Sequence, residues 1–227
     1  MLGRVNLKRL LALWREPGPR PVDVINLITM RESRWYRVYG FFVVPMIYVL
    51  GGSIPWAARH AGSIHGDPQA TELLVVRYPS IARFLWMTTN PFYLLINLFR
   101  ESGVERFQAS FCQMDRAERI TGHPWTVAVH WNGERDEAMR EALEVLGGDL
   151  FYRCREHSAL DFLREYRPTD PNPLRYKALA LIAFDDPDAA RSAFSEQALE
   201  RLGSIADELC VQRYDEFDWR ERPPRAA

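Results

Sequence analysis

A histidine and an asparagine are the first candidates for chemistry in this sequence. His130 lies in the strand-like segment 125–131, and Asn26 lies in the similar segment 22–30. An imidazole titrates near neutral pH, so His130 could act as a general acid or base. The Asn26 amide could orient a carbonyl or hydroxyl group of a ligand. The structural alternatives are a buried histidine satisfied by a backbone carbonyl and an asparagine that only makes polar contacts between strands.

Arg59 and Arg155 follow two copies of one short motif. The segment 49–56 reads VLGGSIPW and the segment 145–152 reads VLGGDLFY, and in this ungapped register Arg59 falls on Arg155. Two guanidinium groups on equivalent strands could clamp a carboxylate or stabilise an enolate. The alternative is a pair of surface arginines that meet some of the chain's 30 acidic residues.

Spacings for metal, nucleotide or nucleophile chemistry do not occur in the sequence. The three cysteines are far apart, and no CxxC or Cys/His ligand spacing is present. His60 and His157 have the right side chain for a metal or a heme, but neither has a partner at HxxxH spacing. GxSxG, Walker and GxGxxG motifs are also absent. We therefore expect no bound metal and a cofactor-independent site.

Two successive β-α-β-β-α-β patterns would position these residues, as in the split βαβ unit of ferredoxin-like folds. In the first half, strands are predicted over 22–30, 54–60, 72–78 and 104–113, and helices over 36–50 and 80–100 with a break at Asn90-Pro91. In the second half, strands are predicted over 125–131, 150–155, 176–184 and 210–217, and helices over 135–146 and 188–209. Because VLGG recurs at the same helix-to-strand junction, the sequence indicates a tandem duplication. Two unrelated α+β lobes are the alternative.

The first half also carries a set of residues found together in one known group of proteins. They are Asn26, Tyr36, Tyr39, Pro45, Gly51-Gly52, the segment VVRYPS at 75–80, Asn90-Pro91-Phe92-Tyr93 and Arg100. With them, residues 22–113 resemble the uncharacterised, domain-of-unknown-function branch of the dimeric α+β barrel superfamily. The second half lacks the tyrosine pair, the helix proline and the Asn-Pro-Phe-Tyr segment. The resemblance implies a single-chain version of a barrel that most members form by dimerisation, with an internal cavity but no particular reaction.

Three segments are expected along the chain. They are an N-terminal amphipathic helix and linker at 1–19, a first ferredoxin-like unit at 20–115 and a second unit at 116–227, with a polar loop at 160–173 over one barrel end. The formal net charge of −1 gives no electrostatic case for nucleic-acid binding. The apolar run 38–50 is shorter than the roughly 20 residues of a spanning helix, and no signal peptide is evident. We therefore expect a cytoplasmic protein, with peripheral membrane contact as an open alternative.

Strand alternation predicts which side chains enter the barrel, because the face of each strand under the helices must be apolar. In the first strand, Ile25 and Leu27 form the better apolar set, so we predict that they face the helices and that Asn26 points inward. In the strand 125–131, the better apolar set is Val127, Val129 and Trp131. His130 would then share the interior with Asn26, and Arg59 or Arg155 would lie at its mouth.

The helices of the first half carry a second signal. The segments 41–50 and 91–99 are apolar on all sides, unlike the amphipathic helix predicted at 135–146. A helix that is apolar all round must be covered on both faces. The cover could be the N-terminal helix, another subunit in a homo-oligomer, a membrane surface or a hydrophobic ligand.

Three functions are compatible with this sequence. The first is a barrel that binds, and in an enzyme converts, a small-to-medium apolar ligand with a carbonyl or carboxylate, with His130 handling protons and Asn26, Arg59 or Arg155 stabilising an oxyanion. The second is a non-catalytic binding or accessory protein with an apolar surface for a partner or a membrane. The third is heme binding, because tandem ferredoxin-like units resemble the chlorite-dismutase architecture, although no proximal-histidine motif matches.

Overall fold

The computed structural model describes residues 11–12, 21–66, 70–117, 125–132, 134–156 and 176–216. The predicted N-terminal helix at 1–19, apart from residues 11–12, lies outside the described residues. The loop predicted at 160–173 and His157 lie outside them as well.

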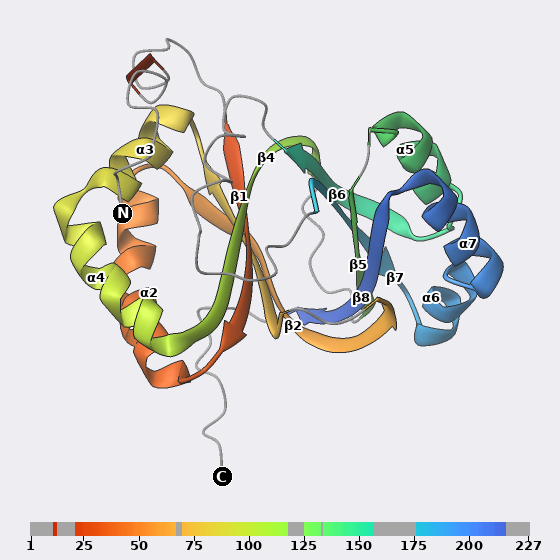
Figure 1. Cartoon of the computed structure of the whole chain (residues 1–227), viewed down its shortest axis with the longest axis horizontal. Helices are drawn as coiled ribbons and strands as arrows, with labels where there is room; N and C mark the ends of the chain where they lie inside the picture. Colours follow the sequence, from red (N-terminus) through yellow and green to blue (C-terminus); the bar gives the residue numbers. More distant parts are fainter. Residues whose placement is uncertain are drawn as a thin grey trace.

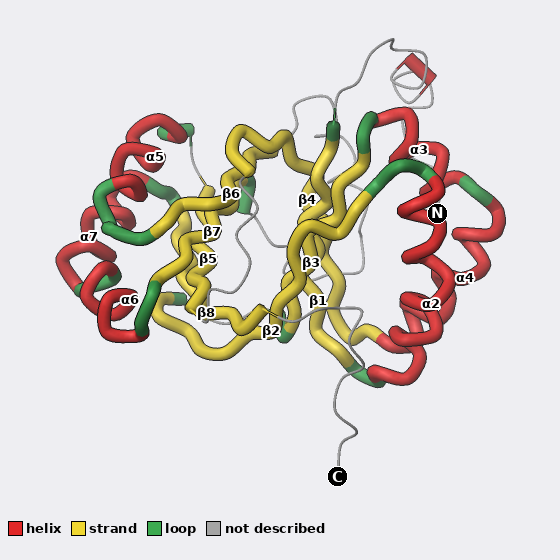
Figure 2. The backbone as a smooth tube through the Cα atoms, turned by 180° about the vertical axis from the view of Figure 1, so that it is seen from behind, coloured by secondary structure: helices red, strands yellow, loops and turns green. Residues whose placement is uncertain are grey.

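Eight antiparallel strands form one closed barrel, and helices lie against its outside at both ends of the long axis (Figures 1 and 2). The strand order around the barrel is β1-β3-β2-β8-β5-β7-β6-β4. The predicted α+β class is confirmed. The first half of the chain supplies one contiguous run of four strands and the second half supplies the other, so the two halves meet along the pairs β2–β8 and β4–β6.

Both halves follow the same order of elements. The first half contains β1 (Val22–Met30), α2 (Ser33–Val49), β2 (Ser53–His65), β3 (Glu72–Tyr78), α3 (Ile81–Thr89), α4 (Pro91–Gly103) and β4 (Val104–Ala117). The second half contains β5 (Trp125–Asn132), α5 (Asp136–Glu144), β6 (Asp149–Glu156), β7 (Ala178–Phe184), α6 (Pro187–Ala193), α7 (Glu196–Ile205) and β8 (Glu208–Glu216). In each half the first strand lies between the third and the fourth, so β1 and β5 occupy equivalent places in the order.

Local sequence explains where the elements begin and end. The side chain of Asn90 accepts a hydrogen bond from the Phe92 amide at 2.8 Å, and Pro91 follows it, so α3 stops and α4 starts at the predicted break. At the two VLGG junctions, Gly51 has φ of 74° and Gly147 has φ of 80°. This left-handed backbone favours glycine, and it turns the chain from helix to strand in both halves.

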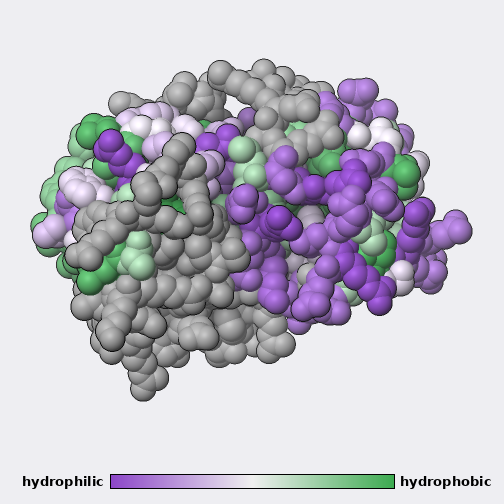
Figure 3. Space-filling model, turned by 90° about the horizontal axis from the view of Figure 1, so that it is seen from above, coloured by the Kyte–Doolittle hydropathy of each residue, from purple (hydrophilic) through white to green (hydrophobic). Residues whose placement is uncertain are grey.

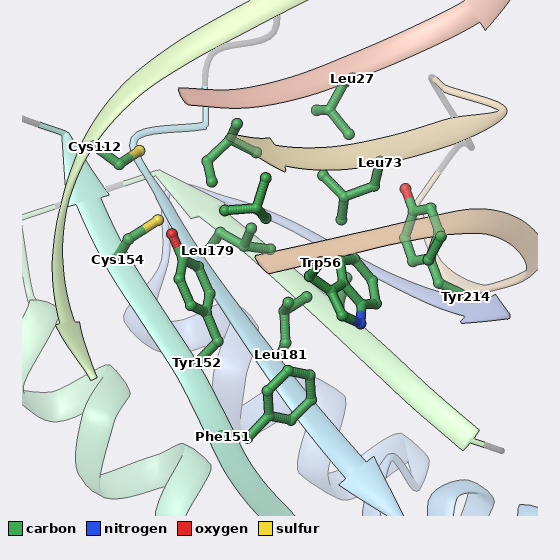
Figure 4. Packing of buried hydrophobic residues seen from close by; sticks show 14 of the residues in the cluster. Leu27, Trp56, Leu73, Cys112, Phe151, Tyr152, Cys154, Leu179, Leu181 and Tyr214 are labelled. Carbon is green, nitrogen blue, oxygen red and sulfur yellow. The ribbon is translucent and has the colours of Figure 1, made fainter. Parts of the chain in front are cut away.

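The buried side chains form three layers. One cluster lies between the first-half strands and α2, α3 and α4, and another lies between the second-half strands and α5, α6 and α7. The third cluster fills the barrel interior. There Leu27, Trp56 and Leu73 of the first half lie opposite Tyr152 and Leu181 of the second half (Figure 4).

The outer surfaces of the two helix layers differ in character. Phe41, Val49 and Leu95, on α2 and α4, are 75%, 82% and 60% exposed. Seen from above, hydrophobic residues appear on the side where Figure 1 places α2–α4, whereas hydrophilic residues dominate the opposite half (Figure 3). None of the described helices is both long enough and apolar enough to span a membrane.

Candidate functional site

His130 lies inside the barrel, on the inward face of β5 and two residues before the end of that strand. Val127, Val129 and Trp131 pack in the second-half helix cluster, as predicted, while Ala128 belongs to the interior cluster. By alternation His130 points the same way as Ala128. Its side chain is 3% exposed, and its ring lies 5.6 Å from that of Tyr176. The Nε2 atom is buried and has no hydrogen-bond partner among the described residues.

Asn26 lies on the opposite face of its strand, so its predicted inward orientation is wrong. Ile25 and Leu27 belong to the interior cluster, whereas Val24 packs under the first-half helices. The Asn26 side chain is therefore on the helix side of β1. Its Nδ2 donates to the carbonyl oxygens of Val24, at 3.0 Å, and Leu74, at 3.2 Å. These bonds satisfy the Asn26 amide within the sheet. Asn26 therefore fits the alternative of an asparagine that only makes polar contacts within and between strands.

Arg59 and Arg155 also leave the sheet on its outer face. Arg59 follows the inward-facing Ala58, and its Nε lies 3.6 Å from Oε1 of Glu72. Arg155 follows the inward-facing Cys154 and is exposed. Neither arginine joins His130 inside the barrel, so the predicted clamp around a shared cavity is wrong. The two do lie on the corresponding second strands of the two halves.

Other polar side chains accompany His130 inside the barrel. His60 lies two residues after the inward-facing Ala58 on β2, so by alternation it also points inward. Its ring lies edge to face against the ring of Tyr214, with 5.9 Å between the ring centres. The Tyr214 hydroxyl donates to Oε1 of Gln212 at 2.7 Å. His130 pairs with Cys210 across β5 and β8, so Gln212, two residues further on, is its diagonal neighbour. We call His60, Tyr214, Gln212 and His130 the histidine strip.

The histidine strip carries no charge at neutral pH. Burial lowers the pKa of His130 to about 4. Burial also lowers the pKa of His60, and the positive charge of Arg213 adds to that shift. The Nε2 atom of His60 is, like that of His130, buried, and in the described part of the chain it has no hydrogen-bond partner. A buried polar atom left unpaired costs about 1–3 kcal/mol, so these two nitrogens weaken the interior face that carries them.

A second set of polar side chains lies in the interior, and its charges are paired with one another. The Nε and Nη2 atoms of Arg77 donate to the two carboxylate oxygens of Asp23, both at 2.8 Å. The Tyr152 hydroxyl also donates to Asp23, at 2.8 Å. We call Asp23, Arg77 and Tyr152 the Asp23 cluster. Because every charge in it is paired, its arrangement is that of a structural ion pair.

Two cysteines lie beside the Asp23 cluster. Figure 4 shows the sulfur atoms of Cys112 and Cys154 close to the hydroxyl of Tyr152. A hydrogen bond with Cys154, together with burial, raises the pKa of the Cys112 thiol well above its ordinary value. A protonated thiol is a poor nucleophile, so Cys112 does not supply one.

Sequence patterns contained part of this site. The sequence suggested His60 only as a metal or heme ligand. It did not single out Gln212, Tyr214 or Asp23. The alternation of Gln212 and Tyr214 with Val211 and Arg213 was a usable signal, because it puts an amide and a phenol on one strand face. Within the described ranges, no three His, Cys, Asp or Glu side chains lie close enough together to hold a metal ion.

Comparisons with known proteins locate only structural neighbours. No protein-family model and no curated protein matches this chain. A protein of unknown function from Rhodopseudomonas palustris is 23% identical with a TM-score of 0.41, over 47% of this chain and 92% of its own. An anthrone oxidase-like protein is 12% identical with a TM-score of 0.48, over 94% and 98%.

A heme-binding protein from Thermus thermophilus is 9% identical with a TM-score of 0.45, over 88% of this chain and 95% of its own. All three TM-scores are below 0.5, so none of these likenesses supports an argument about chemistry. The strand order and the closed barrel define the fold.

Proposed function

We propose that this protein binds a small, mainly apolar molecule with a carbonyl group inside the barrel, beside the histidine strip. The observation that carries the proposal is the buried, unpartnered Nε2 of His130, with a second such atom on His60 of the same interior face. A neutral imidazole can donate one N–H to a carbonyl oxygen or accept a hydroxyl proton. Because the strip holds no cation, a neutral carbonyl suits it better than a carboxylate.

His130 is better suited to binding a ligand than to acting as a general base. A general base works best when its pKa lies near the operating pH, and burial holds the pKa of His130 at about 4. His130 therefore accepts a proton readily only when a negative charge develops beside it, as on an enolate formed from the bound carbonyl. Such a reaction would be cofactor-independent, with His130 as the single proton acceptor.

Native mass spectrometry of the protein from its source organism tests the proposal. We expect a small molecule to co-purify, and we expect His130→Gln to lose it because the amide cannot replace the imidazole geometry. His65→Gln is the matched control, since His65 is an exposed histidine on β2. Equal retention of the molecule by His130→Gln and the control would contradict the proposal.

Heme is the less favoured ligand for the described part of the interior, because it is far larger than a molecule with a single carbonyl group. A large packed cluster of apolar side chains occupies it, including Trp56, Leu73 and Leu181, and the porphyrin ring needs open space next to its axial ligand. The unpartnered nitrogen of His130 is the one feature that favours heme. A Soret band in the purified protein would support heme in place of an organic carbonyl ligand.

A non-catalytic accessory role is the second candidate. It is supported by the exposed apolar side chains of α2 and α4, such as Phe41 and Val49. An exposed patch of this kind suits a partner protein, a second copy of this chain or a membrane surface. Sedimentation velocity, together with vesicle pelleting, separates these outcomes from a monomer that stays in solution.

We further infer that the two halves are tandem copies of one ferredoxin-like unit, with boundaries at 20–115 and 116–227. The shared strand order supports this, and so do the positive φ angles of Gly51 and Gly147 at the two VLGG junctions. The membership of the first unit in the uncharacterised branch of the α+β barrels belongs to the same proposal.

A further inference from the structure

The outer face of the first-half helix layer is apolar and open to solvent. On α2, Phe41 and Val49 are 75% and 82% exposed, and on α4, Leu95 and Leu98 are 60% and 56% exposed. In the described second half, Val145 alone among the large apolar side chains is exposed to a similar degree, at 67%. A contiguous apolar surface of this kind is typical of a site that contacts another molecule or a membrane.

The helices α2 and α4 lie side by side under this face, and aromatic rings connect them. The rings of Trp35 and Phe99 stack with 5.8 Å between their centres, and those of Phe42 and Phe92 meet edge to face at 6.0 Å. A groove of about 390 Å³ runs between the helices, and apart from Ser102 its lining is aliphatic or aromatic. Flexible acyl chains can fill such a groove, whereas a rigid partner must match its shape.

Exposed arginines border the apolar face. Arg34 and Arg37 precede Phe41 on α2 by seven and four residues, which puts them on the same side of that helix. On α3, Arg83 is exposed one turn before Trp86, which is 44% exposed. Figure 1 places α3 at the opposite end of the layer from the start of α2. The face therefore has cations at both ends.

Acidic side chains are few on this layer. The helices α2, α3 and α4 carry four arginines and one acidic residue, Glu101, for a formal charge of +3. Just before α2, Glu32 lies 3.5 Å from Arg34, in an exposed ion pair of the kind that contributes little. The helices α5, α6 and α7 carry seven acidic residues and three arginines, for a formal charge of −4. Since the two layers lie at opposite ends of the long axis, an anionic surface attracts the first and repels the second.

We infer that the α2–α4 layer docks onto the surface of an anionic lipid bilayer. The exposed apolar side chains would enter the boundary between headgroups and acyl chains, and the arginines would contact lipid phosphates. Trp86 suits the headgroup level, where amphipathic rings are enriched. Charge favours a bilayer over a second copy, because a symmetric contact between two such faces would bring arginine against arginine. The inference develops the accessory role proposed above and does not depend on the histidine strip.

Pelleting of the full chain with lipid vesicles tests the role of charge. We expect vesicles that contain phosphatidylglycerol to bind at least about tenfold more tightly than pure phosphatidylcholine vesicles, and added salt to reduce this preference. The double variant Arg37→Gln/Arg83→Gln should lose most of it. Arg191→Gln/Arg201→Gln, on the second-half layer, changes the net charge equally and should keep it. Equal affinity for the two kinds of vesicle, or equal loss in the two double variants, would overturn the inference.

Val49→Asp tests the apolar contact, with Val145→Asp as its matched control. The two valines are exposed and occupy the same place in the two VLGG motifs, so neither change should unfold the chain. Val49→Asp should weaken vesicle binding at least about tenfold, because a carboxylate is unfavourable in the acyl region and is repelled by anionic lipid. Val145→Asp should bind like the original chain, and an equal effect of the two changes would count against docking through α2–α4.

Two further measurements separate this inference from the other proposals. An oligomer in sedimentation velocity that Val49→Asp dissociates, with no vesicle binding by the original chain, would replace the bilayer with a second copy. His130→Gln should pellet with vesicles like the original chain, and a small molecule retained in the barrel should be retained equally by Val49→Asp. Loss of vesicle binding in His130→Gln would contradict docking through the helix layer alone.

Discussion

The imidazole of His130 stays neutral in the fold at mildly acidic pH, where a free imidazole in water would take up a proton. Its ring is buried, burial lowers its pKa to about 4, and one of its nitrogens has no partner within the described ranges. The fold gives up stability at this position, because an apolar side chain of similar size would leave no polar atom unpaired. Side chains with strongly shifted pKa values are concentrated at functional sites. The shifted pKa of His130 therefore makes this residue a candidate for ligand binding.

The depressed pKa of His130 predicts a loss of stability in mild acid. Between about pH 6.5 and pH 4 the unfolded chain binds a proton that the folded chain rejects, so stability falls as the pH falls through that window. Over the full window this amounts to about 3 kcal/mol. His60, whose pKa is also lowered, acts in the same direction.

Urea unfolding at pH 7 and pH 4.5 measures this effect. His130→Gln should flatten the pH dependence, because glutamine does not titrate, whereas the control His65→Gln should keep it. A pH dependence that is the same in His130→Gln and in the original chain would show that His130 is not held neutral by the fold.

At the scale of elements, alternation predicted one barrel strand correctly and another wrongly. In β5 the two faces differ sharply, with Val127, Val129 and Trp131 against Thr126, Ala128 and His130, and the apolar set does face the helices. In β1 both faces are buried, and Val22, Val24 and Ile28 are as apolar as Ile25 and Leu27. A strand buried on both faces gives alternation nothing to distinguish, so Asn26 was placed on the wrong side.

Element positions were better predicted than side-chain directions. The strand predicted at 72–78 is β3, and the break at Asn90-Pro91 separates α3 from α4. These features depend on local signals such as capping side chains and proline. The single helix predicted at 188–209 was wrong, because α6 ends at Ala193 and α7 begins at Glu196 after the bend at Phe194 and Ser195.

Two glycines of the first-half helix layer should respond oppositely to alanine. A Cβ at Gly103 would lie 2.5 Å from the backbone nitrogen of Tyr36, so Gly103→Ala must push α4 away from the start of α2. A Cβ at Gly40, within α2, would meet nothing within 4 Å. We expect Gly103→Ala to destabilise by about 1–3 kcal/mol, and Gly40→Ala to stabilise by up to about 1 kcal/mol.

Thermal unfolding of the two variants measures this contrast. The Gly40→Ala protein is the control, since it changes the same residue type in the same layer without a steric conflict. A Gly103→Ala protein as stable as the original would mean that α2 and α4 are not in close backbone contact.

At the scale of the whole molecule, the Asp23 cluster joins the two halves inside the barrel. Asp23 and Arg77 come from β1 and β3 of the first half, and Tyr152 comes from β6 of the second. The repeated element order allowed a closed barrel to be predicted. The pairing of Asp23 with Tyr152 could not be, because 129 residues separate them and their meeting depends on the register of β4 with β6.

Removing the Tyr152 hydroxyl should weaken the whole barrel. Tyr152→Phe deletes a hydrogen bond to a buried carboxylate, which is worth about 1.5–3 kcal/mol. In an Asp23→Asn background the same change should cost less, since the charge that strengthens the bond is gone. Chemical denaturation of the four proteins of this cycle gives the coupling energy, and additive losses would show that the two groups do not interact.

The closure of the barrel has a consequence for how this protein can associate with others. Every described strand has a neighbour on both sides, and β2 and β4 each pair with the other half along part of their length, so the rows of unpaired backbone N–H and C=O groups that the described strands offer for strand addition from another chain are short. The same residues divided into separate halves would each expose two such rows, on β2 and β4 in one half and on β8 and β6 in the other. Covalent linkage therefore keeps the matching rows at a high effective concentration for each other, and it protects the fold from the edge-to-edge aggregation that threatens an open sheet.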